Sequence, residues 1–85
     1  MKHELMQIGD LLITHGDIEE HDFAERVPFY VSRVGTDDFA SGSMPSCAVV
    51  KSFGFSEAEL FNIERVVRNN MLLVYDYLRG NGAWA

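Results

Sequence analysis

The sequence predicts a small single-domain α+β protein, in which a two-stranded or slightly larger antiparallel sheet packs with a long C-terminal helix and one or two short N-terminal helices. Three observations predict this class. The chain has 85 residues, enough for one hydrophobic core and too few for a second domain. Residues 57–79 have the apolar periodicity of a helix. Residues 28–34 and 46–53 are short and rich in Val, Phe and Tyr, as strands are.

The domain therefore spans 1–85 and has four parts in chain order. We expect an acidic N-terminal segment over 1–27, a strand pair with its loop over 28–53, the long helix over 57–79, and a tail over 80–85. In the first segment, Leu5, Ile8 and Leu12 fall on one face of a helix, which favours a helix within residues 3–14. The β-branched residues that follow Leu12 leave a strand there as the alternative.

A second short helix is expected in residues 17–27. Asp17 with Glu20, and Asp22 with Glu25, have the spacing of capping boxes, and acids in the first turn of a helix are stabilised by its dipole. The helix should end before Pro28, because the residue before a proline disfavours helical geometry.

Two strands joined by a loop are expected in the middle of the chain. Pro28 suits the start or the edge of the first strand. Residues 35–46, between the strands, are rich in Gly, Ser, Asp and Pro, which favours a loop. In this loop Phe39 and Met44 either contact a partner or fold back on the core, and we favour the core.

The long helix has start and stop signals at both ends. Ser56 and Glu59 form a capping box, and Gly80 is placed as the residue after the helix. From 71 to 78 every residue except Asp76 is apolar or aromatic, so this half needs cover on most of its circumference. Either a second copy of the chain covers it, or the helix is central in its own domain. The candidate dimer or partner contacts are Leu72, Leu73, Tyr75, Tyr77 and Trp84.

Negative charge is concentrated near the N-terminus. The formal net charge is −6, and residues 1–25 hold seven acids against Lys2, which gives 1 − 7 = −6 for that segment alone. This balance argues against binding to nucleic acid or to an anionic membrane and favours a protein partner with a basic surface. The candidate partner-binding residues are Asp17, Glu19, Glu20, Asp22 and Glu25. The chain has no signal-peptide pattern or membrane-length apolar run, so we expect a cytoplasmic protein.

Motifs for catalysis or metal binding are weak. His15 and His21 lie six residues apart, which on a helix separates them, and we interpret both as surface residues. A zinc site that adds His3 or Cys47 is conceivable but disfavoured, because only a turn between His15 and His21 could bring these two side chains together. We interpret Cys47, the single cysteine, as a small buried residue. No serine or cysteine has the setting of a nucleophile elbow. We expect no enzymatic activity, no metal and no cofactor.

In size, charge and lack of catalytic motifs, the chain resembles the small acidic inhibitors that phages make against host nucleic-acid machinery, anti-CRISPR proteins among them. The resemblance implies a non-enzymatic inhibitor that occludes a basic, nucleic-acid-binding surface of a host protein. The alternative is a homodimeric structural or assembly subunit that uses the apolar C-terminal helix. A third hypothesis is a small metal-dependent enzyme or sensor built on the histidines and Cys47.

Overall fold

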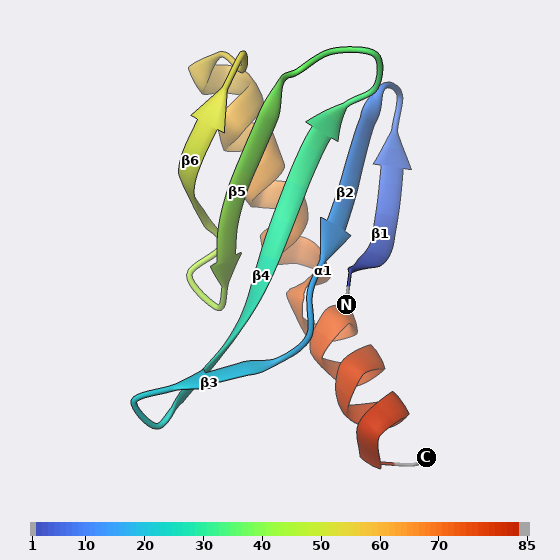
Figure 1. The fold of residues 1–85 in the computed structure, drawn as a ribbon, viewed down its shortest axis with the longest axis vertical. Helices are drawn as coiled ribbons and strands as arrows, with labels where there is room; N and C mark the ends of the chain where they lie inside the picture. The colour runs from blue at the N-terminus through green and yellow to red at the C-terminus, as the bar shows by residue number, and fades with distance from the viewer. Residues whose placement is uncertain (1, 84–85) are drawn as a thin grey trace.

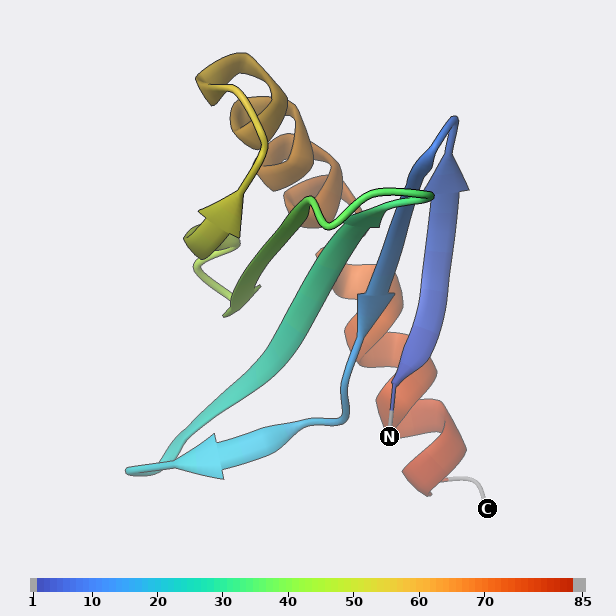
Figure 2. The same ribbon diagram turned by 45° about the horizontal axis from the view of Figure 1, so that its top comes forward.

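The computed structural model describes residues 2–83, apart from the side chains of residue 21 and residues 81–83. Six strands form an antiparallel sheet, and a long helix crosses one face of it (Figures 1 and 2). The elements are β1 (His3–Ile8), β2 (Leu11–His15), β3 (Glu19–His21), β4 (Ala24–Arg33), β5 (Phe39–Met44), β6 (Ala48–Phe53) and α1 (Glu57–Ala83). The strand order is β1-β2-β4-β5-β6, and β3 lies off this path and pairs with β4. The small α+β class with a C-terminal helix is thereby confirmed.

The N-terminal residues form a β-hairpin, so the helix expected within residues 3–14 is wrong. β1 pairs with β2 from His3 opposite His15 to Ile8 opposite Leu11, which leaves Gly9 and residue 10 as a two-residue turn. Gly9 has φ +58°, a conformation that such tight turns require and that glycine adopts without steric cost. The second expected helix, over 17–27, is also wrong, because β3 and the first part of β4 occupy it.

The two expected strands of the middle segment are confirmed as parts of β4 and β6. The expected loop over 35–46 is wrong, since β5 lies there and forms the ladder between them. Packing requires a residue without a side chain at Gly42 of β5. A Cβ atom at Gly42 would overlap the carbonyl oxygen of Ala48 and would lie 2.8 Å from Cζ of Phe29. The glycine that favours a loop in the sequence is therefore needed in a strand, because the backbone of β6 and the ring of Phe29 leave no room for a side chain.

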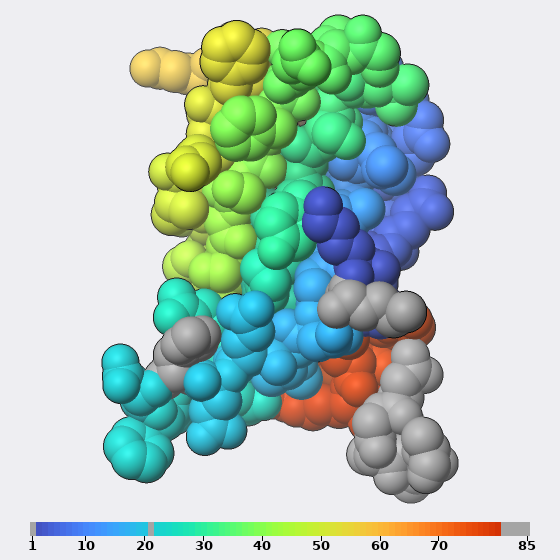
Figure 3. All heavy atoms as spheres, in the orientation of Figure 1, coloured from blue at the N-terminus to red at the C-terminus, as the bar shows by residue number. Residues whose placement is uncertain are grey.

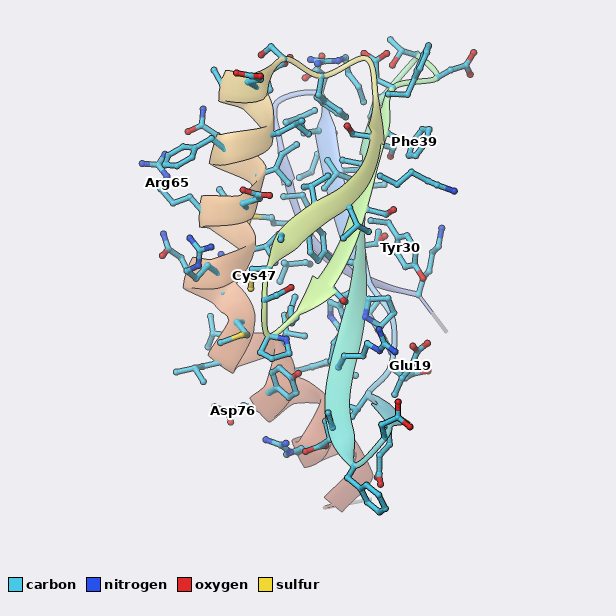
Figure 4. The ribbon with its side chains drawn as sticks, turned by 90° about the vertical axis from the view of Figure 1, so that its left-hand side faces the viewer. Glu19, Tyr30, Phe39, Cys47, Arg65 and Asp76 are labelled. Carbon is cyan, nitrogen blue, oxygen red and sulfur yellow. The ribbon has the colours of Figure 1, made fainter. Side chains whose placement is uncertain are left out.

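The core lies between the sheet and α1. Along β4, Val27, Phe29 and Val31 are buried, and this alternation with period two is that of a strand with one buried face. Met44 is fully buried, so it folds back on the core. Phe39 is 39% exposed and lies with Tyr30 on the opposite face of the sheet (Figure 4). Figure 3 views this face, which is open. The other buried hydrophobic residues are Ile13, Ala40, Cys47, Ile63, Val67, Val74 and Tyr75.

The helix begins as predicted and ends later. The amide of Ser56 donates to Glu59 Oε1 (2.9 Å), and the amide of Glu59 donates to Ser56 Oγ (3.2 Å), which confirms the capping box. Gly80 lies inside α1, which continues to Ala83, so the predicted stop and the tail beginning at residue 80 are wrong. Glycine weakens a helix by only about 1 kcal/mol, so a single glycine does not have to end one. No helix in residues 2–83 has the length and apolarity to cross a membrane.

Arg33 connects three parts of the fold at the end of the sheet where α1 begins. Its guanidinium donates to Asp38 Oδ2 (2.8 Å) and to Glu59 Oε2 (2.7 Å), and it lies 3.7 Å from Asp10 Oδ2. The hydrogen bond from Arg33, with a backbone bond from Ser56, lowers the pKa of Glu59. The turn after β1, the loop after β4 and the helix cap are thus held by one charged group.

Candidate protein-binding hairpin

The most acidic part of the sequence forms the β3–β4 hairpin, which we define as residues 19–26. Glu19 pairs with Arg26, Glu20 with Glu25, and residue 21 with residue 24. The neighbouring strand β5 pairs with β4 only from Val27 onward, so the hairpin extends past the main sheet. Figures 1 and 2 show it projecting from the body of the molecule.

Two residues, Asp22 and Phe23, form the turn of the hairpin. Their φ angles are +51° and +68°, the left-handed values that two-residue turns of type I′ have at both positions. Asparagine followed by glycine is the preferred pair there. Aspartate tolerates this region, whereas a bulky residue such as phenylalanine is an outlier in it.

The side chain of Phe23 is fully exposed. Its relative accessibility is 102%, the value of a side chain that its own fold does not cover. Other large apolar side chains are exposed as well, but among those that the structure describes the next highest value is 79%, for Val50. The tip of the hairpin is therefore an aromatic ring surrounded by solvent.

Carboxylates flank the tip on both faces of the hairpin. Residues of β4 alternate between faces, and Val27 is buried beneath α1, so Glu25 points to the helix side. Arg79 Nη2 donates to Glu25 Oε1 at 2.8 Å, in agreement with this orientation. Glu20, opposite Glu25, shares that face. Glu19 lies on the other side of the sheet, together with Tyr30 (Figure 4).

The five candidate partner-binding carboxylates are all exposed, but they do not form one surface. Asp17 lies before the hairpin, and its Oδ1 accepts a hydrogen bond from His3 Nε2 at 2.7 Å. Glu25 is paired with Arg79, and Glu19 lies across from Arg26. Asp22 lies in the turn, and Glu20 lies two residues before it, opposite Glu25. The acidic segment is thus a two-sided ribbon with an apolar tip, instead of the helix start that the sequence predicts.

A second cluster of titratable groups lies between β1, β2 and α1. The ring of His15 stacks on His3 with centroids 5.1 Å apart, and Tyr77 meets both rings edge-on. The prediction that His15 is a surface residue is wrong, because it is 3% exposed and its Nδ1 hydrogen-bonds the carbonyl oxygen of Gly16 at 2.9 Å. The rings border a hollow of about 360 Å³.

The residues of the metal hypothesis are only partly brought together. His3 and His15 are neighbours, whereas Cys47 lies after β5 and contacts Met71, with the two sulfur atoms 3.8 Å apart. The side chain of His21 lies outside the described residues. Among the side chains that the structure describes, no group of three or more His, Cys, Asp or Glu is placed to hold a metal ion. Burial raises the pKa of the Cys47 thiol, which makes it a poor nucleophile at neutral pH.

The candidate contacts on α1 divide between surface and core. Leu72 is 73% exposed, Leu73 65% and Tyr77 49%. Tyr75 is buried in the core cluster, and Trp84 lies outside the described residues. Sequence reasoning missed Phe23, whose side chain is the most exposed of the large apolar residues that the structure describes. The signal available for it was the strand-like alternation after Glu25, which leaves residues 22 and 23 at a turn.

Comparisons of the chain with known protein families, with curated proteins and with solved structures gave no match.

Proposed function

We propose that this chain is a non-enzymatic protein-binding module, which uses the β3–β4 hairpin to occupy a basic, nucleic-acid-binding surface of a partner protein. The supporting observation is that the acidic residues of the segment are exposed on a ribbon that extends past the sheet. Residues 17–26 contain five acids and Arg26, a net charge of 1 − 5 = −4, and Arg79, which pairs with Glu25, reduces the net charge of this surface to −3. Such a charge complements a surface rich in Lys and Arg and speeds encounter with it.

The hairpin has a firm base, which supports a role in recognition. β4 has ten residues, or roughly 33 Å of strand, and its second half is hydrogen-bonded to β2 and β5 in the middle of the sheet. The carboxylates are therefore carried by the continuation of a central strand. A surface held in its binding geometry loses little conformational entropy when a partner binds.

Occlusion follows from the chemistry of nucleic-acid sites. A groove that binds nucleic acid is lined with Lys and Arg that neutralise phosphates. Carboxylates on a fixed ribbon compete for those cations, with an affinity that falls as salt rises. An inhibitor of this kind, such as those that phages make against host defence, needs no catalytic group.

The proposal is tested by capturing partners from a lysate of the source organism or its host on immobilised protein, at low and at high salt. A Glu20→Lys/Asp22→Lys variant should lose the captured protein, because its charges repel the basic surface. The matched control is Asp37→Lys/Glu57→Lys, which changes the net charge equally at two exposed positions near the start of α1, at the end of the molecule away from the hairpin. It should retain most of the binding.

The captured protein is then purified and tested for nucleic-acid binding. The wild-type chain should displace the nucleic acid, and the hairpin variant should not. Thermal unfolding of both variants should match the wild type, so that lost binding reports on the surface. The proposal fails if no protein is captured, if both variants bind equally, or if the partner binds nucleic acid and the chain simultaneously.

A homodimer is the second candidate function, and the exposure of Leu72, Leu73 and Tyr77 on one part of α1 supports it. Apolar residues grouped on a surface are typical of association sites. Light scattering coupled to size exclusion should then give twice the monomer mass, and Leu72→Glu should restore the monomer. A monomeric mass for the wild type at high protein concentration would remove this candidate.

A further inference from the structure

We infer that Phe23 is the anchor of the β3–β4 hairpin, and that its ring enters an apolar pocket within the basic surface of the partner. This inference rests on the proposed function and specifies the partner further. It assigns the central contact to an apolar group and gives the carboxylates the role of a charged rim.

The first observation is that the ring contributes nothing to packing within its own chain. Phe23 is 102% exposed, although phenylalanine is among the residues most often buried. Its removal leaves no cavity, because no part of the core surrounds it. Aromatic residues are enriched in the buried centres of protein interfaces.

The second observation is that the backbone disfavours phenylalanine at this position. Phe23 has φ +68°, a value that glycine adopts without steric cost and that strains a bulky residue. A turn of this type is more stable with glycine as its second residue. The chain thus has a strained, solvent-exposed aromatic residue where a simpler one would fold better. Strain that persists without benefit to the fold indicates a function for the side chain.

The third observation is the charge around the ring. Glu20, Asp22 and Glu25 lie within three residues of Phe23 and are exposed; Glu25 also pairs with Arg79 of α1, so Glu20 and Asp22 supply most of the charge. An apolar centre with a polar rim is the usual anatomy of a binding patch. A pocket that accepts the ring must therefore have apolar walls and a rim of Lys or Arg. The same carboxylates oppose insertion of Phe23 into an anionic membrane.

The test compares Phe23→Gly with Phe23→Trp and Phe61→Ala. Phe61 is another exposed phenylalanine, 66% accessible and on α1, and it serves as the matched control. Phe23→Gly should raise the unfolding midpoint by a few degrees, because it relieves the left-handed strain. The same substitution should weaken binding to the captured partner at least about tenfold. Phe23→Trp should bind within a few-fold of the wild type, and Phe61→Ala should bind equally.

Binding measured at low and high salt separates the apolar contribution of Phe23 from the electrostatic contribution of the carboxylates. Apolar burial is not screened by ions, so the fold-loss caused by Phe23→Gly should persist at high salt. The loss caused by Glu20→Lys/Asp22→Lys should shrink there. A benzoylphenylalanine crosslinker at position 23 should label apolar residues of the partner that have Lys or Arg beside them.

Four results would overturn the inference. A lower unfolding midpoint for Phe23→Gly would give the ring a structural role. Unchanged binding by Phe23→Gly, with binding lost in the charge-reversed variant, would remove the anchor and leave the proposed function standing. Wild-type binding to phosphatidylcholine vesicles that disappears in Phe23→Gly would assign the ring to a lipid surface. Capture of no protein by the wild type would end both proposals.

Discussion

Gly42 is the position where the smallest change of side chain should have the largest effect on the fold. It lies in β5, and a Cβ atom there would overlap the carbonyl oxygen of Ala48 and lie 2.8 and 2.9 Å from two ring carbons of Phe29. The carbonyl group belongs to the backbone of β6, so no rotamer change relieves the overlap. Gly42→Ala must therefore push β6 away from β5, tilt the Phe29 ring, or do both.

The size of the effect follows from these two routes. Overpacking a core costs about 1–3 kcal/mol, and each backbone hydrogen bond lost between β5 and β6 adds about 1 kcal/mol. Gly42→Ala should thus lower the free energy of unfolding by about 2–4 kcal/mol and Tm by roughly 10–25 °C. Such a loss is a large part of the roughly 4–13 kcal/mol expected for 85 residues.

Urea and thermal unfolding followed by circular dichroism measure this loss. Gly9→Ala is the control, since Gly9 has φ +58° but no atom lies within 4 Å of the place that an added methyl group would occupy. That variant should lose about 1 kcal/mol through backbone strain alone. If Gly42→Ala proved no less stable than Gly9→Ala, the tight contact between β5, β6 and Phe29 would not exist.

Three further predictions concern acid sensitivity, the core and the thiol. Between about pH 5 and about pH 3, Tm should fall more steeply for the wild type than for Glu59→Gln. Arg33 lowers the pKa of Glu59 in the folded state. The stabilisation by this ion pair is therefore present above the unfolded-state pKa and is lost as the pH falls through the folded-state value. Parallel plots of Tm against pH for the two proteins would contradict this. Met44→Ala should lower the free energy of unfolding in denaturant by about 2–5 kcal/mol, whereas Phe39→Ser on the open face should lower it by under about 1 kcal/mol. Equal losses would contradict the faces of the sheet assigned to these two residues. The buried Cys47 thiol should react with a maleimide far more slowly in native protein than in denaturant, and equal rates would show that it is accessible.

The sequence predicts best those elements whose signals are local. Ser56 and Glu59 mark the start of α1 because their capping bonds form within one turn. The run of Val, Phe and Tyr around Phe29 identifies β4, because these residue types favour a strand wherever they occur together. Gly9 weakens a helix without excluding one, and glycine followed by aspartate also favours a two-residue hairpin turn. Only pairing with β2 decides between the two structures.

The β3–β4 hairpin is predictable only in part. Exposure of its acidic residues is expected from their charge, but their geometry is not, because capping-box spacing and strand alternation can coexist in one segment. Asp22 and Phe23 lack the Asn-Gly pair that signals a hairpin, so the only local indication of the turn is the strand-like alternation that begins after Glu25. β5 escapes prediction because Gly42, which favours a loop in the sequence, is required by the Phe29 ring, and that ring comes from another strand.

The order of the strands has a consequence for how the chain folds. Apart from the excursion of β3, each strand of the sheet pairs with the one that precedes or follows it along the chain. Topologies dominated by such local pairing close short loops and tend to fold quickly. The sheet can therefore form strand by strand from one turn to the next. Packing of α1 against it is then the step that completes the core.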